Sequence, residues 1–241
     1  IVSGRALWEE RNPLQNLSEY RKADQEYTPN PPESKELTNT SFNDHAAFEW
    51  EAGLSWQYQH NYTRRRGKLV TTSPYPKLTL KYIASTSDVL GSDLSFQRWS
   101  AQLTENYVSK QYGKGKVLIE AGDFLSTNRL EFIDYKHFNG QRASYDAFII
   151  GDFKLLDYYL HSTTSFYVQG HFEHQFNRLL KSMPWQPVIS ANYLSTKETP
   201  FYVELGVGVA KFLKQWRVDF VSSWEGNQHD RTGIRFGYVL D

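Results

Sequence analysis

The chain has 241 residues and a formal net charge of zero, with 27 basic and 27 acidic side chains. This balance leaves no basic excess for nucleic acid and no acidic tail. Cysteine is absent, which excludes disulfides and cysteine-ligated metals. The length suits one large β domain or two small domains. The sequence begins at Ile1 without a charged segment followed by an apolar run, so we expect a processed or partial chain.

Aromatic residues are abundant in an otherwise polar chain. Trp, Tyr and Phe make up 16% of the residues, yet the mean hydropathy is −0.62. Aromatic rings with a polar handle concentrate in a thin shell at the membrane interface. No apolar run approaches the roughly 18 residues of a transmembrane helix. A closed barrel is the other way to cross lipid, because lipid tolerates no open sheet edge.

The chain divides near residue 43. We predict that residues 1–43 form a polar loop region with one strand near residues 5–10. The run 27–34 contains three prolines and is excluded from a strand interior, because proline donates no ladder hydrogen bond. Residues 44–241 are predicted to form the strands and loops of a transmembrane β-barrel.

Strict alternation begins at residue 48, where apolar side chains take one parity and polar side chains the other as far as residue 58. A period of two indicates a strand with one apolar face. Eleven residues also suit a tilted membrane-spanning strand, which needs about 9–11. We predict nine or ten strands, joined by turns such as 197–200 and 226–230. The other alternating segments are 77–84, 98–107, 166–176, 187–193, 201–210, 216–224 and 234–240, with 114–124 less regular and 138–160 unassigned.

The two parities predict two environments. The apolar side chains predicted to face lipid are Trp50, Leu54, Trp56, Leu80, Trp99, Leu103, Phe172, Phe201, Val203, Leu205, Val207, Val209, Trp216, Val218, Phe220, Trp224, Ile234, Phe236 and Tyr238. The polar side chains predicted to face the lumen are Glu49, Glu51, Gln169, His171, Glu173, Glu204, Arg217, Asp219 and Arg235.

The spacing of Trp216 and Trp224 favours a membrane. They share one face and lie eight residues apart, which at about 3.3 Å per residue and a tilt near 40° places them roughly 20 Å apart along the membrane normal. That matches two aromatic girdles. The alternative is a soluble β-sandwich or lipocalin-like barrel with the apolar face as its core. A charged or glycine-rich polar parity favours the all-β, antiparallel transmembrane barrel.

Several segments carry a family resemblance in a shared order. They are 74–82 with 90–93, 137–141, 170–177, and 204–209 through 217–220. Between residues 41 and 241 the chain resembles the C-terminal barrel of a Bacteroidota outer-membrane family of unknown function, whose members carry a carboxypeptidase-regulatory-like N-terminal domain. These barrels are similar to the surface-antigen barrels of the BamA/TamA superfamily. That superfamily carries a Val-Arg-Gly-Phe/Tyr motif in a long loop that folds into the lumen. This sequence has no such motif, and the nearest segment, 139–143, does not match it. Insertase or secretion-pore activity is therefore not carried over.

The resemblance implies a barrel of about 16 strands, of which this chain supplies the C-terminal part. Missing sequence or a second chain would complete it. It also implies a transport, secretion or membrane-assembly role in the outer membrane of a Gram-negative bacterium. The implied partners are outer-membrane lipid, lipopolysaccharide and other outer-membrane or periplasmic subunits. A passive pore or structural scaffold is the alternative, and a lipid-modifying enzyme is a third hypothesis.

Few residues indicate chemistry, and we predict no catalytic residue, cofactor or metal. His171 and His174 are three residues apart on a strand and should point to opposite faces, so they do not predict a shared metal site. His174 on the apolar parity indicates the headgroup level or a protein contact. Ser222 and His174 are the residues to suspect in a lipid hydrolase or acyltransferase.

Two further features admit both a structural and a functional interpretation. Arg64, Arg65 and Arg66 form a basic hairpin tip, which is either a solvated end or a contact for lipid phosphates or periplasmic partners. Gly206 and Gly208 lie on the lumen parity, where they would let the sheet bend or let an inserted loop approach.

Overall fold

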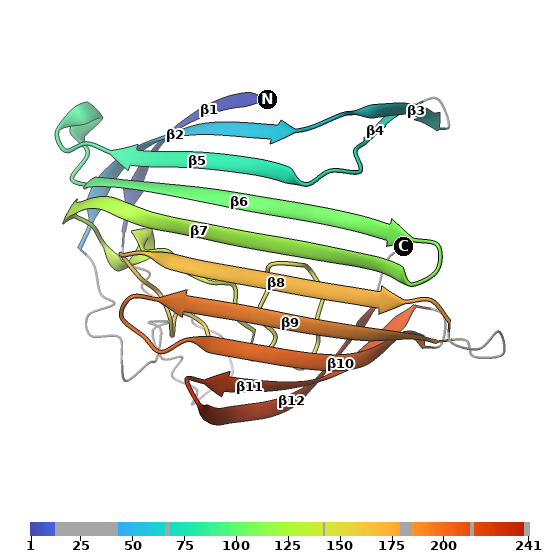
Figure 1. Ribbon diagram of the computed structural model, residues 1–241. Coiled ribbons are helices and arrows are strands. Elements are labelled where there is room, and N and C mark those ends of the chain that lie inside the picture. The colour runs from blue at the N-terminus through green and yellow to red at the C-terminus, as the bar shows by residue number, and fades with distance from the viewer. Residues whose placement is uncertain (13–42, 66–67, 142, 179–184, 213–214, 239–241) are drawn as a thin grey trace, which may run out of the picture.

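The computed structural model describes residues 1–12, 43–65, 68–141, 143–178, 185–212 and 215–238. Ten strands form one antiparallel sheet in the order β1-β2-β5-β6-β7-β8-β9-β10-β11-β12 (Figure 1). Their bounds are β1 Val2–Arg11, β2 His45–Gln57, β5 Lys77–Ser85, β6 Ser95–Ser109, β7 Gly113–Arg129, β8 Tyr167–Phe176, β9 Gln186–Thr196, β10 Tyr202–Phe212, β11 Trp216–Glu225 and β12 Gln228–Tyr238. The all-β prediction is confirmed. The proline-rich run 27–34 lies outside the described residues.

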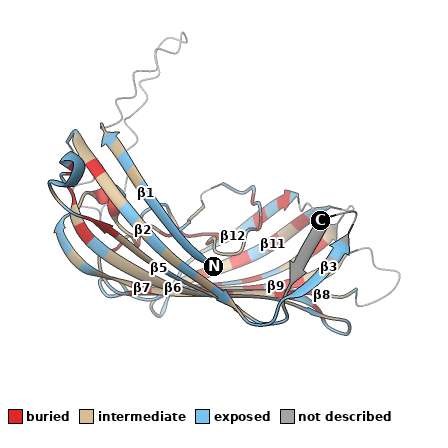
Figure 2. Ribbon diagram, turned by 90° about the horizontal axis from the view of Figure 1, so that it is seen from above, coloured by how far each residue is buried: buried red, intermediate tan, exposed pale blue. Residues whose placement is uncertain are grey.

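The sheet is a curved, open trough. Each strand pairs with the next in the order, and β1 and β12 form its two edges. In the described ranges these edges do not pair with each other, so the sheet is not closed. Figure 2 shows the strands curving from β1 and β2 on one wall to β11 and β12 on the other. This architecture is that of a barrel fragment.

Three local features differ from the prediction or extend it. A basic hairpin tip was predicted at Arg64–Arg66, but the two short strands that lead to it, β3 (Asn61–Arg65) and β4 (Lys68–Thr72), were not; they extend beyond β2 and β5 (Figure 1). The predicted turn at 226–230 is too long: β12 already begins at Gln228, because Gly226 adopts a left-handed φ of 55° that permits a tight hairpin. A strand lies where one was expected near residues 5–10, and β1 pairs with β2 along its length.

The concave side of the trough is filled by the connection between β7 and β8. This inward connection (residues 130–141 and 143–166) contains the short 3₁₀ turn η2 (Phe132–Asp134) and otherwise no regular element except isolated bridges. In Figure 1 it is visible behind the strands. One buried apolar cluster joins it to β8, β9 and β10, and consists of Phe138, Phe153, Leu156, Tyr167, Leu194 and Tyr202.

A second, smaller cluster lies near the start of β2 and β6. It consists of Ala47, Leu94 and Phe96, and a connection with the 3₁₀ turn η1 (Val89–Gly91) contributes Leu94. The structure therefore places its apolar core on the concave side of the sheet. In the described part of the chain, no helix is long and apolar enough to cross a membrane.

The two parities of the strands have opposite surroundings. On the apolar parity of β10, Leu205 is 52% exposed and Val207 is 60% exposed. Glu204, which precedes Leu205 and lies on the polar parity, is 1% exposed. Phe220 and Asp219 on β11 show the same contrast, at 52% and 1%. This is the reverse of a soluble β-sandwich, in which the apolar parity forms the core.

Candidate functional site

A buried charged cluster lies where the inward connection meets β8–β11. The ammonium of Lys154 forms an ion pair with Asp219 and donates a hydrogen bond to Ser190 Oγ at 3.2 Å. Arg217 donates to both carboxylate oxygens of Asp219, at 2.9 and 2.7 Å, and pairs with Glu173 at 2.8 Å. Two cations therefore face two carboxylates. Because an unpaired buried charge is costly, each partner holds the others in place.

Glu204 on β10 fastens the backbone of the inward connection. Its Oε2 accepts the N–H of Lys154 at 2.8 Å, and its Oε1 accepts those of Leu155 and Leu156 at 2.7 and 3.1 Å. Asn192 Nδ2 and the Tyr202 hydroxyl donate to the same carboxylate at 2.7 and 2.9 Å. Charge-assisted bonds of this kind are about twice as strong as neutral ones. Glu204 thus fixes the backbone of residues 154–156 against β10.

The small residues of β10 make room for this cluster. A Cβ on Gly208 would overlap the Asp219 carboxylate, and one on Gly206 would overlap Ser190 Oγ. Both neighbours are partners of Lys154. Gly206 and Gly208 therefore let side chains lie flat across the strand, which serves the approach of an inserted loop.

The same connection covers the free edge of β12. The Asp146 N–H donates to the Phe236 carbonyl at 2.8 Å, and the Phe236 N–H donates to the Ser144 carbonyl at 3.0 Å. Gly237 lies directly under Asp146, since a Cβ there would overlap the Asp146 carbonyl. Arg235 donates to the Lys154 carbonyl from the concave face. The connection is thus held at an edge as well as over the sheet.

At the other wall, the inward connection is tied to β1, β2 and β7. Arg11 pairs with Asp134 and Glu49, both at 2.5 Å. Lys136 pairs with Glu120 at 2.7 Å. The chain between β7 and β8 therefore spans the trough from β1 to β12 and is anchored by charge at both ends.

The outer face carries aromatic rings at both ends of the strands with aliphatic side chains between them. At the strand ends beside the β6–β7 turn, the rings are Trp56, Tyr107, Trp216 and Tyr238. At the opposite strand ends, the rings are Trp8, Trp50, Tyr82, Trp99 and Trp224. Cross-strand pairs within each group include Trp50 with Tyr82 at 5.3 Å and Trp216 with Tyr238 at 6.0 Å between ring centroids. Leu54, Leu80, Ala101 and Ala121 lie side by side between them.

With this geometry established, the comparisons identify a family. The model described as "Family of unknown function (DUF5686) C-terminal domain" matches residues 1–209. The chain belongs to this family. The matched part includes the inward connection with Lys154, and Glu204 on β10, whereas Arg217 and Asp219 lie beyond it. A comparison with curated proteins found no match.

In this DUF5686 domain, the sequence identified much of the sheet's contribution to the cluster. The structure brings together Glu173, Glu204, Arg217, Asp219 and Arg235 around the inward connection. Gln169 and His171 also point inward, and His171 lies 4.7 Å from the Phe153 ring between centroids. Glu49 and Glu51 lie at the far wall with Arg11 and Lys81.

The partners supplied by the inward connection were missed. Lys154, Asp134 and Lys136 lie in segments without a period of two, so alternation gave no signal for them. The run Phe153-Lys154-Leu155-Leu156 offers one clue, because a lysine between apolar residues needs a buried partner if the segment is buried.

His174 lies on the outward parity of β8, as predicted from the alternation, but neighbouring side chains cover it. It is buried, because the Tyr107 ring stacks over it at 5.8 Å and Phe176 packs at 4.4 Å. Its Nδ1 bonds the Tyr107 hydroxyl at 2.9 Å and its Nε2 bonds the Tyr112 carbonyl at 3.1 Å. Gly115 opposite makes this possible, since a Cβ there would overlap the Tyr107 ring. Of the two environments foreseen, the protein contact is the one observed.

The residues considered for chemistry are not brought together. Ser222 on β11 bonds Thr232 Oγ1 on β12 at 2.8 Å, and two strands, β9 and β10, separate it from His174 on β8. His171 lies on the concave side with Asn192 at 3.0 Å, apart from His174. Within the described ranges, no three His, Asp or Glu side chains are arranged to hold a metal ion.

The basic hairpin tip lies on β3 and β4. Arg64 is exposed, Arg65 pairs across the hairpin with Lys68, and Arg66 lies outside the described residues. A contact of these arginines with lipid phosphates stays a prediction.

His161 in the inward connection supplies a pH dependence. Burial lowers its pKa from 6.5 to about 4, and its Nδ1 bonds Thr199 Oγ1 at 2.8 Å. The carboxylate of Asp230 acts in the opposite direction and raises the pKa of His161, but Asp230 is exposed and screened by water, so burial dominates. Below pH 6.5 the unfolded chain binds the proton more readily than the folded chain. The free energy of unfolding should therefore fall by about 3 kcal/mol between pH 6.5 and pH 4 through this group.

Urea unfolding at pH 7 and pH 4.5 measures this effect. The decline should be smaller in His161→Gln, whereas the same change at the exposed His229 should leave it as in the wild type. An equal decline in His161→Gln and the wild type would show that His161 is not buried neutral.

Proposed function

We propose that this domain is part of an outer-membrane β-barrel of a Gram-negative bacterium, acting as a transport, secretion or membrane-assembly component with partner subunits. The observation that carries the proposal is the inverted distribution of side chains. The apolar parity is exposed on the convex face, and the polar parity is packed against the inward connection. Water penalises a continuous exposed apolar face of this extent, whereas hydrocarbon removes the penalty.

The aromatic rings support a membrane-spanning band. Trp50 and Trp56 lie on one face of β2, and Trp216 and Trp224 on one face of β11, with aliphatic residues between. In outer-membrane barrels, two aromatic girdles flank an apolar band about 25 Å tall. Strands of 9 to 17 residues in the main sheet are long enough to cross it when tilted.

The edges of β1 and β12 support a larger barrel. In the described ranges no strand pairs with either edge; on β12, only Phe236 bonds the inward connection, through residues 144 and 146. In lipid every backbone donor and acceptor needs a partner, so further strands have to pair with the rest of these edges. A barrel of about 16 strands, similar to the BamA/TamA surface-antigen barrels, would meet this need, and another segment or a second chain would supply the remainder. Bacteroidota origin and a carboxypeptidase-regulatory-like N-terminal domain belong to the same proposal.

The basic hairpin tip supports a contact at one rim of the barrel. Arg64, Arg65 and Arg66 would meet phosphate headgroups or a periplasmic subunit through guanidinium–phosphate or ion-pair contacts. Lipopolysaccharide would meet the rim that faces outward.

Membrane fractionation followed by SDS electrophoresis tests the proposal. The full-length protein should sediment with outer membranes, and unheated samples should migrate differently from boiled ones, because a closed barrel has no free strand edge and resists SDS. Recovery in the soluble fraction without a heat-dependent shift would overturn it.

A passive pore or scaffold is the second candidate. The inward connection spans the trough and is fastened at β1, β2 and β9–β12, as expected of a static filling. Conductance in planar bilayers separates the two functions. Large, steady, ion-selective currents without partners would favour the pore.

A further inference from the structure

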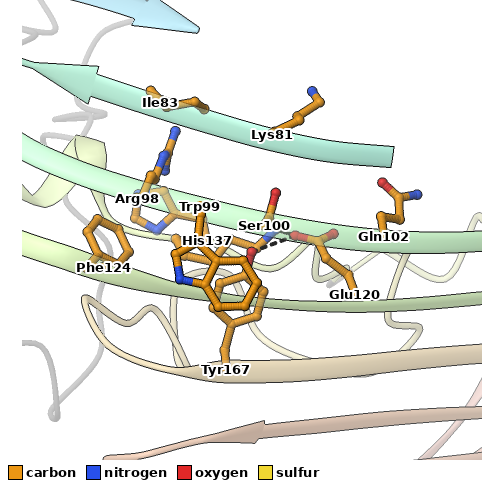
Figure 3. A pocket seen from close by; sticks show the side chains of 11 residues that line it. Lys81, Ile83, Arg98, Trp99, Ser100, Gln102, Glu120, Phe124, His137 and Tyr167 are labelled. Atoms are coloured by element: carbon orange, nitrogen blue, oxygen red, sulfur yellow. Dashed lines mark hydrogen bonds and ion pairs between the residues drawn. The ribbon is translucent and has the colours of Figure 1, made fainter. Parts of the chain in front are cut away.

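A second interior feature is a cavity of about 320 Å³ between β5–β7 and the inward connection. Figure 3 shows the side chains that line it, drawn from β5, β6, β7 and, with Tyr167, from β8, together with His137 of the inward connection. It is separate from the Lys154–Asp219 cluster, with which it shares no lining residue. Its polar lining includes Lys81, Arg98, Ser100, Gln102, Glu120 and Lys136.

Arg98 is the central cation of this cavity. Its Nη1 donates to the Asp134 carbonyl at 3.3 Å, and its guanidinium carbon lies 5.9 Å from the centres of both the Phe96 and Phe124 rings. The two rings and the carbonyl hold the planar group in one orientation. Among the described residues Arg98 forms no ion pair, which leaves N–H donors for a ligand.

Glu120, the carboxylate that the described part of the chain contributes to the lining, already has several hydrogen-bond donors. Glu120 accepts hydrogen bonds from Lys136 at 2.7 Å, Tyr167 at 2.6 Å and Gln169 at 2.9 Å; Figure 3 marks the bond to Tyr167. It therefore neutralises Lys136 and leaves Arg98 free. Lys81 is 3.5 Å from Glu51 and its side chain is 47% exposed, so it can turn towards an anion.

The count of charges favours an anion. Among the described residues that line the cavity, three are cations, Lys81, Arg98 and Lys136, and one is a carboxylate, Glu120. Adding Glu51 outside the lining still leaves an excess of one positive charge. A cavity with a fixed guanidinium and an excess cation concentrates anionic solutes, because low-dielectric walls focus the field.

We propose that this cavity binds a small solute bearing a phosphate or carboxylate group. Arg98 holds two oxygens of the anion in a bidentate geometry, and Lys81 provides the second charge. Ser100 and Gln102 supply neutral hydrogen-bonding groups for the rest of the ligand. Ligand sites span roughly 300–1,000 Å³, so the volume suits one phosphate ester or organic acid and excludes a polymer. This inference rests on the interior geometry alone and extends beyond the proposed function.

Calorimetric titration of the full-length protein in mild detergent tests the site, with inorganic phosphate and glycerol 3-phosphate as the probes and glycerol as the neutral control. We expect saturable binding of both anions and none of glycerol. Arg98→Gln should weaken binding at least about tenfold, since a charge-assisted hydrogen bond contributes about 1.5–3 kcal/mol and 1.4 kcal/mol is tenfold. Arg129→Gln is the matched control: it is exposed at the end of β7, outside the lining, and should change affinity less than about twofold.

Lys81→Gln is a second variant that tests the site if Arg98→Gln does not fold. Lys81 is half exposed, so its replacement leaves the packing of the cavity wall unchanged. The Lys81→Gln change should weaken anion binding several-fold. Absence of saturable anion binding in the wild type overturns the proposal. So does unchanged affinity in a folded Arg98→Gln, or, where that variant does not fold, in Lys81→Gln. Membrane fractionation and the heat-dependent shift should be the same in Lys81→Gln and the wild type, so failure of the anion site and failure of the barrel proposal are distinguishable.

Discussion

Glu204→Gln is expected to release the inward connection from β9–β11. An amide keeps one acceptor oxygen but turns the other into a donor that faces the N–H groups of the connection. At least two charge-assisted bonds are lost, which should cost about 3 kcal/mol or more. Limited proteolysis of the purified protein should then cut within residues 143–166, and the urea midpoint should fall.

Glu198→Gln is the matched control for this change. Glu198 is exposed and bonds the Thr163 and Ser165 hydroxyls of the same connection, so it should show a change of less than about 1 kcal/mol. If Glu204→Gln resists protease as well as the wild type does, the backbone bonds of residues 154–156 do not hold the connection.

A double change, Lys154→Met with Asp219→Leu, should lower the free energy of unfolding less than Lys154→Met alone does, because the single change leaves Asp219 without one of its buried cationic partners. The urea midpoints of the two variants measure the difference.

Lysine on the exposed apolar parity should discriminate between lipid and water. Leu205→Lys and Val207→Lys place a charge near the middle of β10, on the convex face. In a membrane barrel each should cost about 2–4 kcal/mol and reduce the heat-resistant form. In water, an exposed leucine or valine can become lysine within about 0.5 kcal/mol. The measurement is the folded fraction in outer membranes and in vesicles of defined thickness.

Val108→Lys provides the control for this pair. Val108 is 84% exposed at the end of β6, on the polar parity of that strand, beside the turn to β7 and away from the centre of the strands. Both its face and its position keep a lysine there out of the lipid. Near an interface the cost of lysine falls to about 0–1 kcal/mol. Equal, small effects at residues 108, 205 and 207 would contradict a lipid-facing convex surface.

Strand positions and side-chain parity were accessible from the sequence. Alternation is a local property: on β10 the residues Val203, Leu205 and Val207 must share a face because successive side chains point to opposite sides of a strand. The same rule placed Glu204, Arg217 and Asp219 on one side of the sheet, where the structure has them buried. The strands β3 and β4 on either side of the predicted hairpin tip were missed because they are short and their alternation is weak.

The partners of those buried charges were not accessible in the same way. Lys154 meets Asp219 across 65 residues of chain, and Arg11 meets Asp134 across 123. No periodic signal marks either contact, since the inward connection has neither a strand period nor a helical one. His174 shows the same limit: its parity pointed outward, but the ring of Tyr107 from another strand covers it.

The sequence by itself determined that this protein is an antiparallel all-β domain whose strands carry one apolar and one polar face, because both follow from a period of two along single segments. The tertiary structure decided that the apolar face lies on the outside of a curved sheet, and that the inward connection fills the concave side. Curvature and long-range pairing arise from the packing of all ten strands together, so the buried ion pairs and the Arg98 cavity exist only once that packing has brought distant residues into contact.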